Sequence, residues 1–322
     1  MTKAYAELHC HTDFSFLDGA SPADDLVERA VELGLSALAV TDHQGLYGAG
    51  RFSAAAREAG LHAVMGMEVE LLDSAAPDPE RIVVPRRRRQ RREAQPAPAD
   101  PSAGEPVRPP VERQRPPGHR DPRREDLRGV RPRELGPHLT LLARDQAGYA
   151  NLCRLASAAH LAGTKGVPRF THASLEEHHD GLVILTGCRH GELSRRLLVG
   201  DREGAVRALE RLEGIAAAGG LYVELQHHLL PDDDWLTAEL ARLAHRTGLP
   251  TVVTNDAHYA LRSDRELQDV LVSIRHGQDL DAAAHLRRPN GEYALKDGAE
   301  LAALPPGHDS DPLVRHAWLD GI

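Results

Sequence analysis

Histidine and carboxylate residues recur in this sequence at the ends of short apolar runs. His9 and His11 flank one cysteine, and the strand period of two points both imidazoles to the same face. Asp256 and His258 repeat this spacing near the other end of the chain. The remaining candidates are Asp18, His43, Glu68, His138, Cys188, His227 and His228. A lone His-x-His is usually incidental, but this many donors in matching positions favours a metal site.

The donor types indicate which chemistry such a site would support. Many imidazoles with a few carboxylates and one thiol suit zinc, manganese or iron better than magnesium. The donors outnumber the four ligands of a closed structural zinc, which favours two or three ions sharing bridging carboxylates. Such ions lower the pKa of a bound water to about 7 and stabilise charge on a phosphoryl group. Phosphoester hydrolysis is therefore favoured, while metal-dependent amide or amine hydrolysis stays open.

The elements that must position these donors alternate along the chain. Short β-branched runs predict strands at residues 4–8, 37–41, 62–71, 138–143, 181–186, 221–225 and 251–254. Amphipathic segments such as 201–218, 235–247 and 264–275 predict helices between them. This alternation favours a parallel α/β fold, either a barrel or a doubly wound sheet. In a barrel the carboxyl ends of the strands converge on one rim, so we expect the scattered donors to meet there.

The bulk composition is typical of a soluble globular protein, with 41% hydrophobic and 27% charged residues among 322. No apolar run approaches the roughly 18 residues that cross a bilayer, so we expect a cytoplasmic protein without membrane contact. The three cysteines cannot all pair, and none lies in a C-x-x-C motif, which disfavours a disulfide framework.

The segment from residue 77 to residue 137 differs from the rest of the chain. It is rich in arginine, proline and alanine, and almost nothing in it could fill a hydrophobic core. We therefore expect a disordered insertion. Its basic tract could contact nucleic acid electrostatically, but a solvated linker is the favoured interpretation. Without this tract, the chain is strongly acidic, which suits metal binding better than a broad nucleic-acid-binding face.

Four motifs resemble those of the polymerase and histidinol phosphatase (PHP) family. They are His9-x-His11, Thr41-Asp42-His43, Gly66-Met67-Glu68 and Asn255-Asp256-Ala257-His258. Further stretches at residues 138–145, 148–152, 186–188 and 265–271 are similar to the N-terminal PHP domain of bacterial C-family DNA polymerases. These comprise the alpha subunit of DNA polymerase III and its error-prone relatives. Residues 162–170, together with the insertion, resemble the error-prone branch.

The resemblance implies a distorted seven-stranded (β/α)7 TIM-like barrel that holds up to three metal ions. It also implies nine ligands, all of a type that can serve. They are His9, His11, Asp18, His43, Glu68, His138, Cys188, Asp256 and His258. The implied activity is that of a metal-dependent phosphoesterase, which in some polymerases resembles a 3′–5′ exonuclease that proofreads. The implied partners are DNA, as a single strand or a primer 3′ end, and a polymerase core or other replication and repair proteins.

The resemblance also suggests a division of the chain. Residues 1–76 and 138–285 form the two parts of the barrel, 77–137 the insertion, and 286–322 a linker towards a polymerase core. The catalytic aspartates of nucleotidyl transfer in this family belong to a part that this chain lacks. We therefore expect that the chain alone does not synthesise DNA, whether it is a truncated product or one half of a split polymerase.

Several single residues keep two interpretations. Cys188 is either a ligand or a small core hydrophobe, while Cys10 should point the opposite way, into the barrel packing. His227 and His228 are expected to face substrate or solvent. Lys165 and Arg169 could grip a phosphate or simply lie in a surface loop.

Two rival functions remain. One is a small-molecule phosphatase resembling histidinol-phosphate phosphatase. The other is a metal-stabilised scaffold without catalytic activity.

Overall fold

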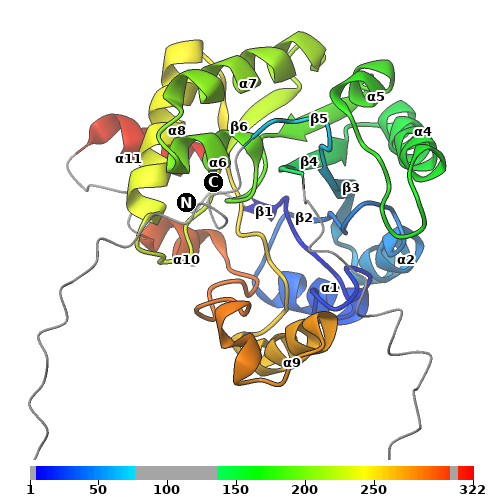
Figure 1. The fold of residues 1–322 in the computed structure, drawn as a ribbon. Coiled ribbons are helices and arrows are strands. Elements are labelled where there is room, and N and C mark those ends of the chain that lie inside the picture. Colours follow the sequence, from blue (N-terminus) through cyan, green and yellow to red (C-terminus); the bar gives the residue numbers. More distant parts are fainter. Residues whose placement is uncertain (1–4, 77–135, 305–310) are drawn as a thin grey trace, which may run out of the picture. The chain divides into compact units, whose positions relative to one another are not determined.

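The structure is a computed structural model that describes residues 5–76, 136–304 and 311–322. Contacts along the chain group the described residues into a first unit, Met1–Pro79 with Leu135–Ile322. The first unit contains every described residue and forms the fold shown in Figure 1. The expected insertion at residues 77–137 lies outside the described residues, apart from its last two positions.

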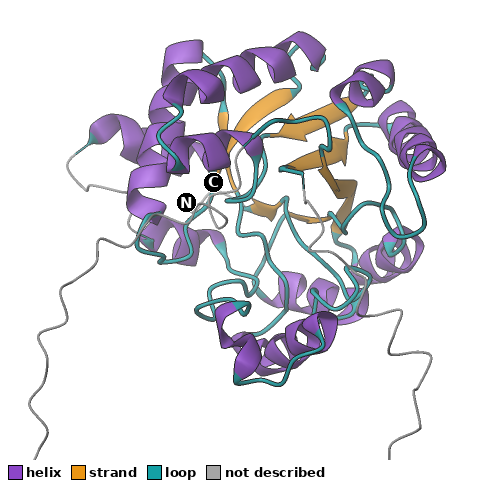
Figure 2. Ribbon diagram, viewed as in Figure 1, coloured by secondary structure: helices purple, strands orange, loops and turns teal. Residues whose placement is uncertain are grey.

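Seven strands form one sheet in which spatial order follows chain order. They are β1 (Ala6–Glu7), β2 (Ala37–Val40), β3 (His62–Glu70), β4 (His138–Ala143), β5 (Leu182–Leu185), β6 (Leu221–Leu225) and β7 (Thr251–Val253). Every strand expected from the sequence is present, with ends that differ by two residues at most. Figure 2 shows the strands inside and the helices around them, which confirms the α/β barrel-like fold.

Most helices connect successive strands and cover the outside of the sheet. They are α1 (Ala23–Glu32), α2 (Ala49–Ala59), α4 (Gln146–Ala162), α5 (His172–Glu177), α6 (Glu192–Leu198), α7 (Arg202–Ile215), α8 (Asp233–Thr247), α9 (Arg265–His276), α10 (Gly298–Ala303) and α11 (Pro312–Gly321). Two short 3₁₀ helices, Arg262–Asp264 and Ala282–His285, flank α9. Since the helices pack their apolar sides against the strands, one core cluster extends from Tyr5 to Trp318.

Strand β4 runs antiparallel to both of its neighbours, β3 and β5, and the other four strand pairs are parallel. The expectation of an all-parallel sheet is therefore wrong at this strand. A parallel strand would need a crossover to the far end of the sheet, whereas an antiparallel strand starts where its predecessor ends. Glu70, the last residue of β3, pairs with His138, the first residue of β4. His138 therefore lies at the rim where β3 ends.

Backbone pairing also joins the two ends of the sheet. Cys10, beyond β1, forms a parallel bridge with Ala257, beyond β7. The His11 amide donates to the Ala257 carbonyl at 2.7 Å, and the Ala257 amide donates to the His9 carbonyl at 2.9 Å. Cys10 itself is buried in the main core, as expected. The sheet therefore curls so that the segments just beyond β1 and β7 pair with each other.

The end of the chain differs from the linker expected at residues 286–322. Leu295, Leu301, Val314 and Trp318 belong to the same core cluster as the barrel. Helix α11 packs against β7 and α8, and the Trp318 indole donates to the Leu301 carbonyl at 3.0 Å. The apolar residues here are few and separated by proline, glycine and charged residues, which hides a packing pattern in the sequence. In the part of the chain that the structure describes, no helix is long and apolar enough to span a membrane.

We predict that Trp318→Ala lowers the free energy of unfolding by about 3–5 kcal/mol, because it removes a fully buried indole from the core. Leu319→Ala, at a 36% exposed neighbour on the same helix, should cost well under 1 kcal/mol. Chemical denaturation followed by circular dichroism measures both changes. Equal stabilities for the two variants would contradict the packing of α11 on the barrel.

Candidate metal centre

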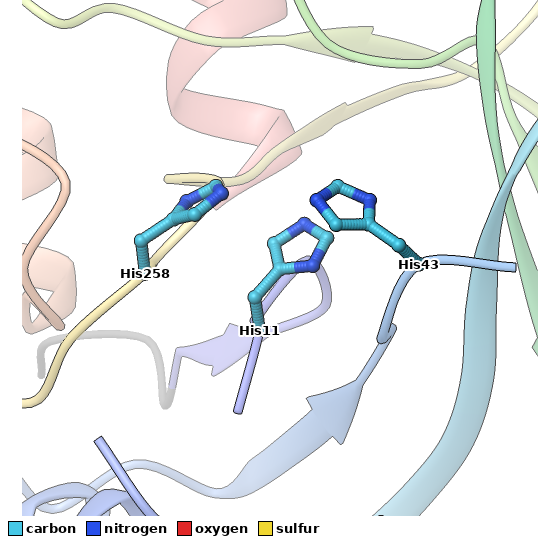
Figure 3. A group of neighbouring side chains, drawn as sticks. All are labelled: His11, His43 and His258. Atoms are coloured by element: carbon cyan, nitrogen blue, oxygen red, sulfur yellow. The ribbon is translucent and has the colours of Figure 1, made fainter. Parts of the chain in front are cut away.

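The nine side chains expected as ligands lie together at the rim where β1, β2, β3, β5, β6 and β7 end. They include three groups whose donor atoms lie within 4.8 Å of one another. These groups are His11, His43 and His258; His9, His11 and Asp256; and Glu68, His138 and Cys188. Figure 3 shows His11 between His43 and His258, with ring centroids 4.4 Å from each. Donors separated by almost 250 residues of sequence thus share one site.

Asp18 lies beside the first group, and Glu68 connects that group with the third. Asp18 Oδ2 lies 2.9 Å from His43 Nε2 and 3.6 Å from His258 Nε2. One carboxylate oxygen of Glu68 lies 2.8 Å from His138 Nδ1 and 3.6 Å from the Cys188 sulfur, while the other lies 2.8 Å from His43 Nδ1. Glu68 therefore presents one oxygen to each side of the site, as a bridging carboxylate would. The position of Cys188 beside two other donors favours the ligand interpretation over a plain core residue.

Among the nine expected ligands, three buried side-chain atoms make no hydrogen bond to the described residues. They are Nε2 of His9, Nε2 of His11 and Oδ1 of Asp256. The opposite ring nitrogens are occupied, since His9 Nδ1 lies 2.7 Å from Glu224 Oε1 and His11 Nδ1 lies 3.0 Å from Ser15 Oγ. An unpaired buried polar atom is costly, so three of them at one point indicate a missing partner. A divalent cation fits this set, because a metal-bound imidazole usually donates its second ring N–H to a protein oxygen.

A second layer of carboxylates orients these imidazoles, and sequence reasoning missed most of it. Glu224 on β6 is fully buried and accepts from the hydroxyl of Thr254 at 2.5 Å as well as facing His9. A glutamate inside the apolar strand Leu221–Leu225 was the available signal. Asp42 accepts from the Ser15 hydroxyl at 2.8 Å and so holds His11 indirectly.

Burial and neighbouring charges shift the pKa values in opposite directions across the site. Burial, with the positive charges of His258 and His43, lowers the pKa of His11 to about 3. Burial also disfavours the charged form of His43, but hydrogen bonds to Asp18 and Glu68 outweigh this and raise its pKa to about 10. Burial opposes ionisation of Asp256, yet His258 and His9 hold its pKa well below the usual range. The site therefore mixes a neutral imidazole with ionised carboxylates.

The backbone is strained at this rim. Four non-glycine residues adopt positive φ among the described residues: Leu17 (61°), Gln44 (59°), Leu229 (57°) and Asp256 (47°). Each follows the end of a different strand, β1, β2, β6 or β7. Such conformations cost on the order of 1 kcal/mol each and concentrate at functional sites.

Comparison with known proteins gives this site a family. The family model of the PHP domain matches residues 7–228. The chain therefore belongs to the PHP domain family. It is 41% identical over 94% of its length to the error-prone DNA polymerase of Nocardia farcinica, and 30% identical over 94% to the DNA polymerase III subunit alpha of Treponema pallidum. It spans 26% and 22% of those two proteins, about a quarter of their length.

Among solved structures, an amidohydrolase from Chromobacterium violaceum is 16% identical, with a TM-score of 0.40, covering 79% of this chain and 88% of that chain.

Arg288 is a further residue of this PHP centre that the sequence did not single out. Its guanidinium lies 4.5 Å above the Tyr293 ring, donates to Nε2 of His258 and lies 3.6 Å from Asp18 Oδ1. It comes from the segment expected as a linker, where two adjacent arginines gave no sign of which one turns inward. The positively charged guanidinium of Arg288 therefore lies beside the proposed ligands Asp18 and His258. A metal ion bound by these two residues would require Arg288 to move.

The four residues expected to contact substrate have different surroundings. His227 and His228 are buried, so neither is solvated: His227 Nε2 lies 2.9 Å from Asp234, and His228 stacks on Tyr293 with a centroid distance of 4.0 Å. Lys165 and Arg169 are exposed in the loop between α4 and α5. Phe170, next to Arg169, forms a bridge with Leu71, three residues beyond Glu68. A phosphate contact by Lys165 or Arg169 stays a prediction.

We predict that Glu224→Gln weakens metal binding by about 10- to 100-fold, because it removes the charge that orients His9. Glu213→Gln, at an exposed position of α7, is the matched control and should bind metal like the wild type. Competition with a chromogenic zinc chelator measures both affinities. The same affinity in Glu224→Gln and wild type would contradict the role of Glu224.

We also predict that metal binding releases protons. Because the pKa of His43 is about 10 without a metal, this imidazole is protonated at pH 7. A metal ion binds the neutral ring and must displace that proton, so affinity should rise with pH below 10, about tenfold per pH unit for each proton. Calorimetric titration in buffers of different ionisation enthalpy counts the protons. Binding without proton release at pH 7 would contradict this.

Proposed function

We propose that this PHP region binds two or three divalent ions, zinc, manganese or iron, through the nine residues described above and hydrolyses phosphoesters. Its proposed substrate is the 3′ end of a DNA strand, so that it acts as a 3′–5′ exonuclease within an error-prone C-family DNA polymerase. The observation that carries this proposal is the convergence of three buried donor atoms without hydrogen-bond partners, on His9, His11 and Asp256.

The donor set supports more than one ion. Eight of the nine donors fall into three groups, two of which share His11, and this number exceeds what one ion can take. Glu68 lies between the groups as a shared carboxylate. Divalent ions held there would supply hydroxide at neutral pH and would stabilise negative charge on a phosphoryl group. The buried carboxylates Glu224 and Asp42 keep the imidazoles of His9 and His11 in place during this chemistry.

Arg288 supports a phosphate-containing substrate. Its guanidinium is next to Asp18 and His258 and keeps a partly exposed side chain. Arginine matches two oxygens of a phosphate at once, so an Arg288 displaced by a metal ion can contact the substrate. His43 and His138 also keep part of their surface open to solvent, which suits a strand end arriving from outside.

The relatives support DNA as the substrate class. Proteins named error-prone DNA polymerase and DNA polymerase III subunit alpha match nearly the whole chain. The chain spans only about a quarter of those proteins. We therefore also propose that it takes part in DNA synthesis only together with a partner such as a polymerase core. A small-molecule phosphatase and a metal-stabilised scaffold are the outcomes that the experiment must separate.

The test follows hydrolysis of a 5′-labelled single strand by the full chain with manganese or zinc. We predict shortening from the 3′ end, loss of activity on chelation, and at least about a hundredfold loss in Asp256→Asn, which removes one donor charge. Chelation should also lower the melting temperature, because bound ions stabilise the folded state.

Asp24→Asn, at an exposed carboxylate paired with Arg51, should keep full activity. Hydrolysis of histidinol phosphate but not of DNA would favour the small-molecule phosphatase. A protein that binds metal and hydrolyses neither substrate would overturn the proposal in favour of the scaffold.

A further inference from the structure

We infer that Phe16 and Tyr47, two exposed aromatic side chains beside the metal centre, form a stacking platform for the unpaired bases of a single strand. This inference rests on the proposed function and names residues that would distinguish a nucleic-acid strand from a small phosphate ester. The two residues lie in the loops that follow β1 and β2, directly after the proposed ligands His11 and His43.

Exposed aromatic residues are concentrated at this rim. The chain has 12 aromatic residues, and five of them are exposed. Three of these five, Phe14, Phe16 and Tyr47, come from the two loops, and Phe16 is 80% exposed. Burying one such side chain normally stabilises a protein by about 1.5–3 kcal/mol, so leaving three beside one site indicates a binding surface.

The turn that carries Phe16 is tied to the metal centre on both sides. Ser15 lies 3.0 Å from the His11 ring, and Asp18 lies 2.9 Å from the His43 ring. Between them, the Asp18 amide donates to the Ser15 carbonyl at 2.9 Å and Leu17 adopts a φ of 61°. This tight turn directs Phe16 outward although an apolar side chain there gains nothing from water. The strained residue Leu17 thus lies next to an exposed aromatic ring and close to two proposed ligands, as strained residues at functional sites do.

Tyr47 is held by contacts on two sides although the residue is 58% exposed. Its hydroxyl lies 3.1 Å from His160 Nε2, which in turn lies 2.9 Å from the Gln44 carbonyl oxygen. The ring also covers Gly45, where a Cβ atom would come within 2.5 Å of it. A side chain fixed in this way loses little conformational entropy when a flat ligand stacks on it.

The two loops that carry the rings touch each other. The Phe14 ring lies against Gly48, the residue after Tyr47, where a Cβ atom would be 3.1 Å from its Cδ2. Helices α1 and α2, which follow these loops, lie side by side in Figure 1. Positive charge is also close: Arg275 Nη1 lies 3.4 Å from Asp18 Oδ2, beside Arg288.

This combination fits a single strand better than a protein partner. Proteins that bind single strands combine aromatic rings, on which bases stack, with cations that track the backbone. Here the rings and two arginines surround a centre whose donors suit a phosphoester. Bases in a duplex are already stacked on each other, so the platform requires an unpaired end.

The experiment measures binding of a fluorescein-labelled, eight-nucleotide phosphorothioate strand to the full chain with manganese, by fluorescence anisotropy. Phe16→Ala and Tyr47→Ala should each weaken binding by roughly five- to a hundredfold, and Phe16→Trp should retain it. Tyr149→Ala is the matched control: Tyr149 is 38% exposed near the start of α4, which follows the end of β4 remote from His138. That variant should bind like the wild type.

Two further measurements separate this inference from the proposed function. Hydrolysis of a strand with abasic sites at its last three positions, which offers no ring to stack, should be the same in wild type and Phe16→Ala. A strand with abasic sites at its last three positions should bind both proteins equally. Unchanged binding of the normal strand by Phe16→Ala and Tyr47→Ala, or an equal loss with the abasic strand, would overturn the platform. Absence of hydrolysis of both the normal and the abasic strand in the wild type would instead count against the proposed function.

Discussion

The backbone pairing of residues 9–11 with Ala257 is the contact on which the site depends. In an open sheet of the same strand order, β1 and β7 would lie at opposite edges, and their donors would be separated by the whole width of the sheet. Two hydrogen bonds above the strand ends bring His9 and His11 against Asp256 and His258. The reversed strand β4 makes a second contribution, because its first residue, His138, thereby reaches Glu68. Closure and reversal together turn scattered donors into one centre.

Without a cation, the centre lowers the stability of the fold. The buried carboxylate of Asp256 stays ionised because imidazoles surround it, while burial keeps His11 neutral. Strained residues at Leu17, Gln44, Leu229 and Asp256 add to this cost. Divalent ions would replace the protons, satisfy the unpaired donor atoms and relieve the mutual repulsion of the imidazoles. Folding and metal binding are then coupled, and the barrel itself, with its large buried core, must supply enough stability for the apo site to persist.

The sequence predicted the parts of the site that follow from local periodicity. His9-x-His11 and Asp256-x-His258 lie at strand ends, so a period of two was enough to place each pair on one face. The direction of β4 could not be predicted in this way, since apolar alternation carries no information on strand direction. Arg288 and the packed end of the chain were missed because their contacts are set by tertiary packing. Glu224 could have been identified from the sequence, because a carboxylate inside an apolar strand needs a buried partner.

The positions of the site residues suggest a division between fixed and adaptable parts. The donors that must keep their geometry come from strand ends or the first residues beyond them, where ladder hydrogen bonds hold the backbone. The residues suited to substrate recognition come from the turns that follow. The segment from His11 to Asp18 unites both roles within eight residues, since Ser15 holds an imidazole and the next residue presents an exposed ring. A change at Ser15 or Asp18 therefore acts on metal geometry, whereas a change at Phe16 acts on substrate contact.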